Sequence, residues 1–200
     1  MKDKLLIAIT GGIGSGKSIV SSIIESQGYC VLKSDSIAKK IMLEDNEIKQ
    51  EIIKYFGTQS YINNQLNTEY LSEKVFSSKE NLEKINSIVH PKTIKKTLEL
   101  AEKEFQKSKY VFVESALIYE AKIEKYFDYI ILIYSDEQSR IRRVMERDKI
   151  PEDKIRQRMN FQIPDEKKKA RADFVIENNH DLVELEKKVL FVLNLIKFLK

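Results

Sequence analysis

The chain has 200 residues, 42% of them hydrophobic and 33% charged, with a formal net charge of +4. This length and composition are typical of a globular protein with one sizeable α/β core and one or two small insertions. The single cysteine, Cys30, excludes an intramolecular disulfide framework and a cysteine-based zinc site.

Neither end of the chain resembles a targeting or membrane segment. The apolar run near the N-terminus, Leu5–Thr10, is too short for a secretory signal. The apolar C-terminal stretch is interrupted by Asn194 and Lys197, whereas a membrane-spanning helix needs about 20 apolar residues. We therefore expect a core-packing C-terminal helix and a cytoplasmic protein that does not associate with membranes.

Leu5–Thr10 predicts a buried strand, and the octapeptide GGIGSGKS follows it at Gly11–Ser18. This sequence matches G-x-x-x-x-G-K-[ST], a loop whose backbone N–H groups surround nucleotide phosphates. Its glycines permit a tight turn, Lys17 brings a cation to the β- and γ-phosphates, and the Ser18 hydroxyl can ligate Mg²⁺. A helix predicted from about Lys17 to Gln27 points its positive end at the same anion. A glycine-rich turn without a ligand is the alternative.

The remaining elements alternate between short apolar strands and longer helical patterns. The stretch 58–68 is polar and rich in turn residues, including Asn63-Asn64. Further strands are predicted at 29–32, 110–113, 129–134 and 173–176. Helices are predicted at 35–40, 46–56, within 68–107 with an interruption at His90-Pro91, and at 136–148, 152–163, 165–171 and 181–199.

Strands that alternate with helices predict an α/β fold with a five-stranded parallel sheet covered on both faces. The carboxyl ends of such strands form the ligand-binding edge, which places the glycine-rich loop, Asp35 and Glu114 along one rim. We expect one domain with two inserts. Its core would comprise about 1–57, 109–147 and 172–200, with a helical insert at about 58–108 and a lid at about 148–171.

Arginine is confined to one part of the chain. Residues 139–171 hold twelve lysines or arginines against six acidic residues, and every other cation of the chain is a lysine. The planar guanidinium fork suits phosphate oxygens, so this pattern favours a phosphate-binding lid. A solvated basic helix pair and a nucleic-acid patch are alternatives. The seven arginines are Arg140, Arg142, Arg143, Arg147, Arg156, Arg158 and Arg171.

The chemistry of the rim favours a kinase over a nucleotide switch. The N-K-x-D and D-x-x-G motifs of GTPases do not occur in the sequence. A kinase needs a base beside the acceptor hydroxyl, cations for developing charge and a lid against water. Asp35, after the second strand, is placed to be that base. It could also be a helix N-cap.

At several points the chain resembles the dephospho-CoA kinase family, whose members are P-loop kinases. The resemblance covers most of the chain in a fixed block order and is not confined to the glycine-rich loop. The resembling segments are TGGIGSGKS at 10–18, S-D-x-I-A at 34–38, VF at 75–76, IVHP at 88–91, ALIYE at 116–120, R-x-x-x-R-D at 143–148, R-x-x-x-Q at 158–162 and ADFVIENN at 172–179.

Some positions depart from the family pattern. Lys33 replaces the first Asp of a D-A-D segment, which leaves Asp35 as its only carboxylate. Thr68 stands where the family usually has Arg, and Ala116 stands where Pro is usual. Arg140 occupies a position where Gln is common. The change at Thr68 bears on binding of the acceptor.

The resemblance implies a three-layer P-loop fold with ATP and dephospho-CoA as substrates, Mg²⁺ as cofactor and no nucleic-acid partner. It implies Asp35 as the general base, with Lys17 and Arg143 also catalytic. For Glu114 the alternative to a binding role is a buried cap or salt bridge, and for Tyr119 it is packing. His90 is expected chiefly to order the insert. ATP would be bound by Gly12, Ile13, Gly14, Ser15, Gly16, Lys17, Ser18, Ile19, Arg143, Arg147 and Asn178, Mg²⁺ by Ser18, and the acceptor by Asp35, His90, Glu114, Leu117 and Tyr119. The rival interpretations are another small-molecule P-loop kinase, such as a nucleoside monophosphate kinase, or a nucleotide-gated nucleic-acid-binding protein.

Overall fold

The computed structural model describes residues 4–199. The chain forms two compact units. The first comprises Met1–Leu32 and Ala101–Lys200, and the second comprises Lys33–Leu100. The second unit therefore begins well before the insert predicted at 58–108, and it ends earlier.

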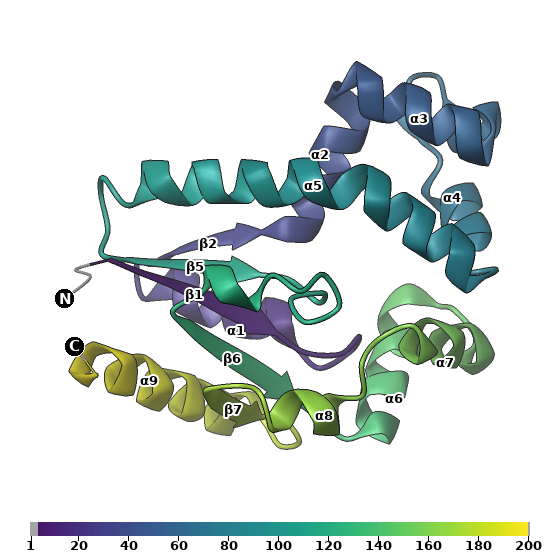
Figure 1. The fold of residues 1–200 in the computed structure, drawn as a ribbon. Coiled ribbons are helices and arrows are strands. Elements are labelled where there is room, and N and C mark those ends of the chain that lie inside the picture. The colour runs from purple at the N-terminus through teal and green to yellow at the C-terminus, as the bar shows by residue number, and fades with distance from the viewer. Residues whose placement is uncertain (1–3, 200) are drawn as a thin grey trace. The chain divides into compact units, whose positions relative to one another are not determined.

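The first unit is built on a five-stranded sheet with the order β2-β5-β1-β6-β7 (Figure 1). Strand β1 pairs in parallel with β5 and β6, and β6 pairs in parallel with β7. All six residues of the central strand β1 are buried, which explains its uninterrupted apolar sequence. The predicted parallel sheet is confirmed. Its strands are β1 (Leu5–Thr10), β2 (Cys30–Lys33), β5 (Tyr110–Glu114), β6 (Tyr129–Tyr134) and β7 (Phe174–Glu177).

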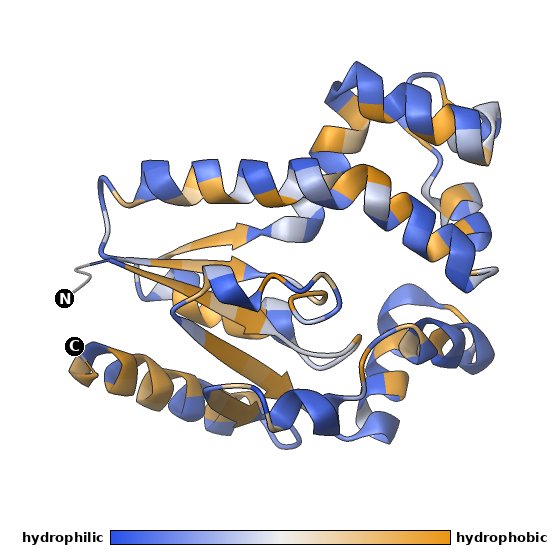
Figure 2. Ribbon diagram, in the orientation of Figure 1, coloured by the Kyte–Doolittle hydropathy of each residue, from blue (hydrophilic) through white to orange (hydrophobic). Residues whose placement is uncertain are grey.

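Two helices, α1 (Lys17–Ser26) and α9 (Leu182–Phe198), pack on one face of this sheet through a shared apolar core. Alternate residues of β1, such as Ile7 and Ile9, point into that core, while Ala8 points to the opposite face. On that opposite face Ala8 packs with Ile118 from the segment after β5. Figure 2 shows the apolar character of these strands.

The first unit has further helices, a short one before β6 and the others between β6 and β7. The Asp136 side chain caps α6 by accepting a hydrogen bond from the Ser139 amide at 2.9 Å. Helix α6 packs on α7 through Ile141, Val144 and Ile155. In the described part of the chain no helix is both long and apolar enough to span a membrane. These elements are η2 (Glu124–Tyr126), α6 (Glu137–Asp148), α7 (Glu152–Asn160) and α8 (Asp165–Lys169).

The second unit has its own apolar core. Ile48 and Ile52 pack there with Leu71 and Val75, and Ile41 packs against the same cluster. Because these residues come from helices on both sides of position 58, residues 33–57 belong with the insert and not with the sheet. The elements are α2 (Ser34–Glu44), α3 (Asn46–Phe56), η1 (Thr58–Ser60), β3 (Tyr61–Ile62), β4 (Gln65–Leu66), α4 (Thr68–Val75) and α5 (Lys79–Glu104), whose last turn lies in the first unit.

Two local features of this unit differ from the sequence-based expectation. The polar stretch 58–68 contains a small hairpin of β3 and β4, because Asn63 (φ 49°) and Asn64 (φ 62°) both adopt the left-handed conformation that a two-residue hairpin turn needs. The predicted interruption at His90-Pro91 is wrong, since α5 runs through Pro91. Proline removes one backbone hydrogen bond, but buried residues on either side, Val89 and Thr93 among them, keep the helix packed.

Candidate functional site

The glycine-rich loop Gly11–Ser18 joins β1 to α1 in a tightly braced turn. Gly14 (φ 78°) and Gly16 (φ 100°) have left-handed backbones that other residues rarely adopt. The Asn178 side chain, directly after β7, donates from Nδ2 to the Ser15 carbonyl at 2.8 Å. A Cβ atom on Gly16 would lie 2.2 Å from the same Nδ2. Glycine at position 16 is therefore required both by the turn and by its brace.

Lys17, the first residue of α1, turns its side chain back onto the loop. Its Nζ donates to the Gly11 carbonyl at 2.9 Å and to the Gly12 carbonyl at 3.1 Å. These bonds hold a cation against the first two residues of the loop, where the loop amides and the N-terminus of α1 also favour an anion. The predicted contact of Lys17 with nucleotide phosphates stays a prediction.

Glu114 ends β5 and reaches the helix that follows the loop. One carboxylate oxygen accepts from Ser18 Oγ at 3.2 Å and the other from Ser21 Oγ at 2.7 Å. Hydroxyl and carboxylate oxygens are ligands that Mg²⁺ accepts together with nucleotide phosphates, so Ser18 and Glu114 fit such an ion. Within residues 4–199 no group of three or more His, Cys, Asp or Glu side chains is placed to hold a metal ion, here or elsewhere. Ser21 was not predicted, although it lies three residues after Ser18 on the same helix face.

Arg143 lies where β6 and β7 end. Its guanidinium donates from Nη1 to Ser135 Oγ at 3.1 Å and from Nη2 to the Asn178 carbonyl at 2.8 Å. The structure thus joins Arg143 to the residue that braces the glycine-rich loop. Arg147, one turn further along α6, is exposed and forms a two-pronged pair with Asp148 at 2.7 and 2.9 Å. That pairing raises the pKa of Arg147 and lowers the pKa of Asp148.

The arginines do not form a single phosphate-facing cluster. Four of the seven pair with carboxylates of the first unit, so their forks serve internal contacts. Neither the phosphate-binding lid nor the alternative of a solvated basic helix pair predicted these ion pairs. The pairs are Arg140–Asp165, Arg147–Asp148, Arg156–Glu137 and Arg171–Glu124.

Tyr119, predicted as an acceptor contact, is 2% exposed and packs in the core beside Ile118. The Arg171 guanidinium lies over its ring at 4.4 Å. Burial, as the main cause, raises the pKa of Tyr119 to about 12. The structure therefore favours the packing alternative for this tyrosine. Leu117, in the turn after β5, is half-buried, and its amide donates to Ser115 Oγ at 3.3 Å.

Asp35 and His90 lie in the second unit. Asp35 is exposed in the first turn of α2, and the N-cap of that helix is Lys33, so Asp35 is not the cap. The half-buried His90 belongs to α5. Burial lowers the pKa of His90, and the negative charge of Asp35 partly opposes this shift. The charge of Asp35, the predicted base, therefore acts on His90, the histidine that was expected to order the insert.

His90 makes the stability of this protein depend on pH. Its folded-state pKa is lowered, so the unfolded chain binds more protons, and stability is lost as pH falls below about 6.5 toward the folded pKa. We expect His90→Gln, which cannot titrate, to lack this loss. Thermal unfolding of both proteins between pH 7.5 and 5.5 measures it. Parallel declines of the two melting temperatures would contradict this assignment.

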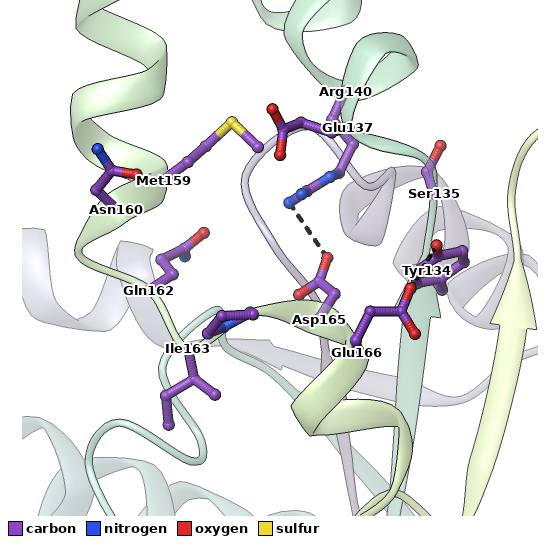
Figure 3. A pocket seen from close by; sticks show the side chains of 11 residues that line it. Tyr134, Ser135, Glu137, Arg140, Met159, Asn160, Gln162, Ile163, Asp165 and Glu166 are labelled. Atoms are coloured by element: carbon purple, nitrogen blue, oxygen red, sulfur yellow. Dashed lines mark hydrogen bonds and ion pairs between the residues drawn. The ribbon is translucent and has the colours of Figure 1, made fainter.

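Two residues of the predicted lid contact the glycine-rich loop. Gln162 Oε1 accepts from the Ile13 amide at 2.9 Å, and Asp165 Oδ2 accepts from the Gly12 amide at 3.3 Å. Figure 3 shows Gln162 and Asp165 on the wall of a cavity of about 370 Å³, with Arg140 bonded to Asp165. In the sequence Gln162 stood out only as part of a motif, and Arg140 only as one of the clustered arginines and as a departure from the family pattern. The role of Asp165 had no signal in the sequence.

Comparison with known proteins identifies a family that this chain matches. The profile of a family described as dephospho-CoA kinase matches residues 5–184. A dephospho-CoA kinase of Fusobacterium nucleatum is 39% identical over 186 residues, which cover 92% of this chain and 95% of that protein. The corresponding protein of Listeria monocytogenes is 34% identical, with 92% of each chain covered.

Solved structures give the same result. The structure of TT1252 from Thermus thermophilus has a TM-score of 0.77 at 32% identity and covers 96% of this chain and 97% of that one. Dephospho-CoA kinase from Campylobacter jejuni has a TM-score of 0.64 at 28% identity, with 97% and 98% covered. A shikimate kinase from Bacteroides thetaiotaomicron, with a TM-score of 0.52 and 11% identity, is similar in fold alone.

Proposed function

The chain belongs to the dephospho-CoA kinase family, and we propose that it transfers the γ-phosphoryl group of ATP to the ribose 3′-hydroxyl of dephospho-CoA. The products are ADP and coenzyme A, so the reaction completes coenzyme A biosynthesis. The observation that carries this proposal is the family match over residues 5–184, which extends far beyond the glycine-rich loop. We also infer a cytoplasmic location, in keeping with ATP as co-substrate and a single cysteine.

ATP binds with its phosphates along the loop from Gly12 to Ser18 and on to Ile19. The loop amides and the N-terminus of α1 provide donors, and Lys17 supplies a positive charge beside them. The Ser18 hydroxyl and the Glu114 carboxylate, 3.2 Å apart, would hold Mg²⁺. When bound, the ion would neutralise charge on the phosphate oxygens. In this proposal the main role of Glu114 is to hold Mg²⁺, and any contact with the acceptor is secondary.

Asp35 accepts the proton of the 3′-hydroxyl as the new O–P bond forms and the bond to the β-phosphate oxygen breaks. Its position two residues after β2 and its exposure are consistent with this role. His90 orders the acceptor-binding insert beside Asp35, and Leu117 contributes to the acceptor site. Arg147 assists in charge neutralisation after release from Asp148.

Arg143 supports ATP binding indirectly, through two hydrogen bonds to other residues of the protein in a planar arrangement that lysine cannot reproduce. Its two donors reach Ser135 Oγ and the Asn178 carbonyl, and Asn178 in turn braces the loop beneath the phosphates. We expect Arg143→Lys to lower kcat/KM for ATP about tenfold or more, because one charge-assisted hydrogen bond is lost. The exposed neighbour Arg142 provides the control, since Arg142→Lys should leave kcat/KM near that of the wild type. Equal kinetics for Arg143→Lys and Arg142→Lys would refute the assignment.

The choice of acceptor tests the proposed function. ADP release is measured with dephospho-CoA and, separately, with each nucleoside monophosphate at the same concentration. The proposal expects rapid ADP release with dephospho-CoA only. If nucleoside monophosphates react and dephospho-CoA does not, the protein is a different small-molecule kinase and the proposal is wrong.

A further inference from the structure

The end of the lid is joined to the glycine-rich loop by side chains of a short segment, Gln162–Asp165, which we call the lid root. It connects α7 to α8. Its Gln162 accepts from the Ile13 amide, and its Asp165 accepts from the Gly12 amide. These are the first two amides after Gly11. The placement of the lid root and the path of the loop are therefore linked by direct contacts.

A buried charge cluster holds the lid root in place. The Asp165 side chain, 4% exposed, lies 3.2 Å from Arg140 Nη1 and 3.9 Å from the ammonium of the fully buried Lys168. Lys168 Nζ lies 2.9 Å from Glu120 Oε1, which also accepts from the Ile163 amide at 2.9 Å. The cluster holds two cations and two anions. Removing one charge would leave a buried partner unbalanced, so the four residues act as a unit.

The loop is shaped to admit this cluster. A Cβ atom on Gly12 would lie 2.0 Å from Arg140 Nη1 and 2.7 Å from Asp165 Oδ2. A Cβ atom on Gly14 would lie 2.5 Å from the Arg140 carbonyl. Gly12 does not have a positive φ. The lack of a side chain at position 12 therefore makes room for the Arg140–Asp165 ion pair.

A second contact joins the same elements. The Ile13 side chain packs against the cluster formed by Ile141, Val144 and Ile155, which come from α6 and α7. Gly12 and Ile13 thus contact the lid root through hydrogen bonds from their backbone amides to its side chains, and Ile13 also packs against α6 and α7. The cavity beside the ion pair, with Gln162 on its wall, keeps the lid root from being packed on every side (Figure 3).

We propose that Arg140 and Asp165 are positioning residues. They couple the conformation of the first half of the glycine-rich loop to the position of the lid root. The proposal rests on the proposed function for its nucleotide, ATP. Binding of ATP to the loop and placement of the lid root then influence each other by the same factor. Neither residue touches the reacting atoms. Asp165 acts through the Gly12 amide and Arg140 acts through Asp165, while Gln162 of the same lid root holds the Ile13 amide.

The proposal is tested with Asp165→Asn, Arg140→Gln and the double variant. Calorimetry measures ATP affinity, and hydrogen exchange measures protection of the Gly12 and Ile13 amides. Each single variant should bind ATP about tenfold more weakly and expose these amides to faster exchange. The double variant should lose less than the product of the single losses, because it removes the two opposite charges together. As control, Arg156→Gln removes a more exposed lid arginine paired with Glu137 and Glu152 and should match wild type.

A purely structural cluster would give a different result. Melting temperatures would fall, while ATP affinity and amide exchange in the folded variants would equal those of the wild type, and this outcome would overturn the proposal. If the charge variants fail to fold, Gln162→Met provides a milder test, because it removes only the acceptor of the Ile13 amide. Wild-type amide exchange and ATP affinity in this variant would also overturn the proposal. Neither measurement uses dephospho-CoA. Failure of the proposed acceptor would therefore be recognised separately.

Discussion

Replacing Asp35 by asparagine is expected to reduce kcat for dephospho-CoA phosphorylation at least about 100-fold, the low end for loss of a general base. The amide has nearly the same shape but cannot take the hydroxyl proton. Because Asp35 is exposed and does not cap α2, the protein should fold normally and bind ATP with near wild-type affinity. Single-turnover rates and ATP calorimetry on the same preparation separate the two effects.

Asp45→Asn is the matched control for this variant. Asp45 also lies at a helix N-terminus, where its side chain accepts from the amides of Glu47 and Ile48. Asparagine caps helices about as well as aspartate, so this variant should keep the wild-type kcat. A wild-type kcat in Asp35→Asn would show that another group, or water, accepts the proton.

Replacing Lys17 by methionine should lower kcat/KM for ATP by about 10² to 10³, the range for loss of one preorganised charge-stabilising donor. Methionine has a similar length but no charge, and it cannot donate to the carbonyls of Gly11 and Gly12. Steady-state kinetics with varied ATP measure the effect. Lys187→Met, at an exposed position on α9, should be unchanged. A loss confined to melting temperature would mean that Lys17 only stabilises the loop.

The sheet and the glycine-rich loop could be predicted because their signals are local. The apolar run of β1 and the octapeptide after it need no information from distant residues, and the strand Tyr129–Tyr134 was found with the bounds that the structure shows. The bracing of the loop was not predictable. Asn178 lies 163 positions from Ser15, and Asp165 lies 153 positions from Gly12. Nothing in a single sequence indicates such pairs.

Tertiary packing also explains where the structure differs from the sequence-based predictions. Pro91 is an effective helix breaker in isolation, but buried neighbours on both sides hold α5 together. The insert was predicted from about 58, whereas the second unit begins at Lys33, because α2 and α3 share a core with α4. The concentration of arginine was observed correctly and interpreted too narrowly. Only the structure shows that four guanidinium groups meet carboxylates of the first unit.

The identity of the phosphorylated product tests the central claim most directly. The purified protein is incubated with ATP, Mg²⁺ and dephospho-CoA, and the product is analysed by mass spectrometry and phosphorus NMR, with 3′-deoxy-dephospho-CoA as control. We predict that the natural acceptor gains one phosphoryl group on the ribose 3′-oxygen, with one ADP released per product, and that the deoxy analogue gains none. Phosphorylation at another position, or of the deoxy analogue, would contradict this function.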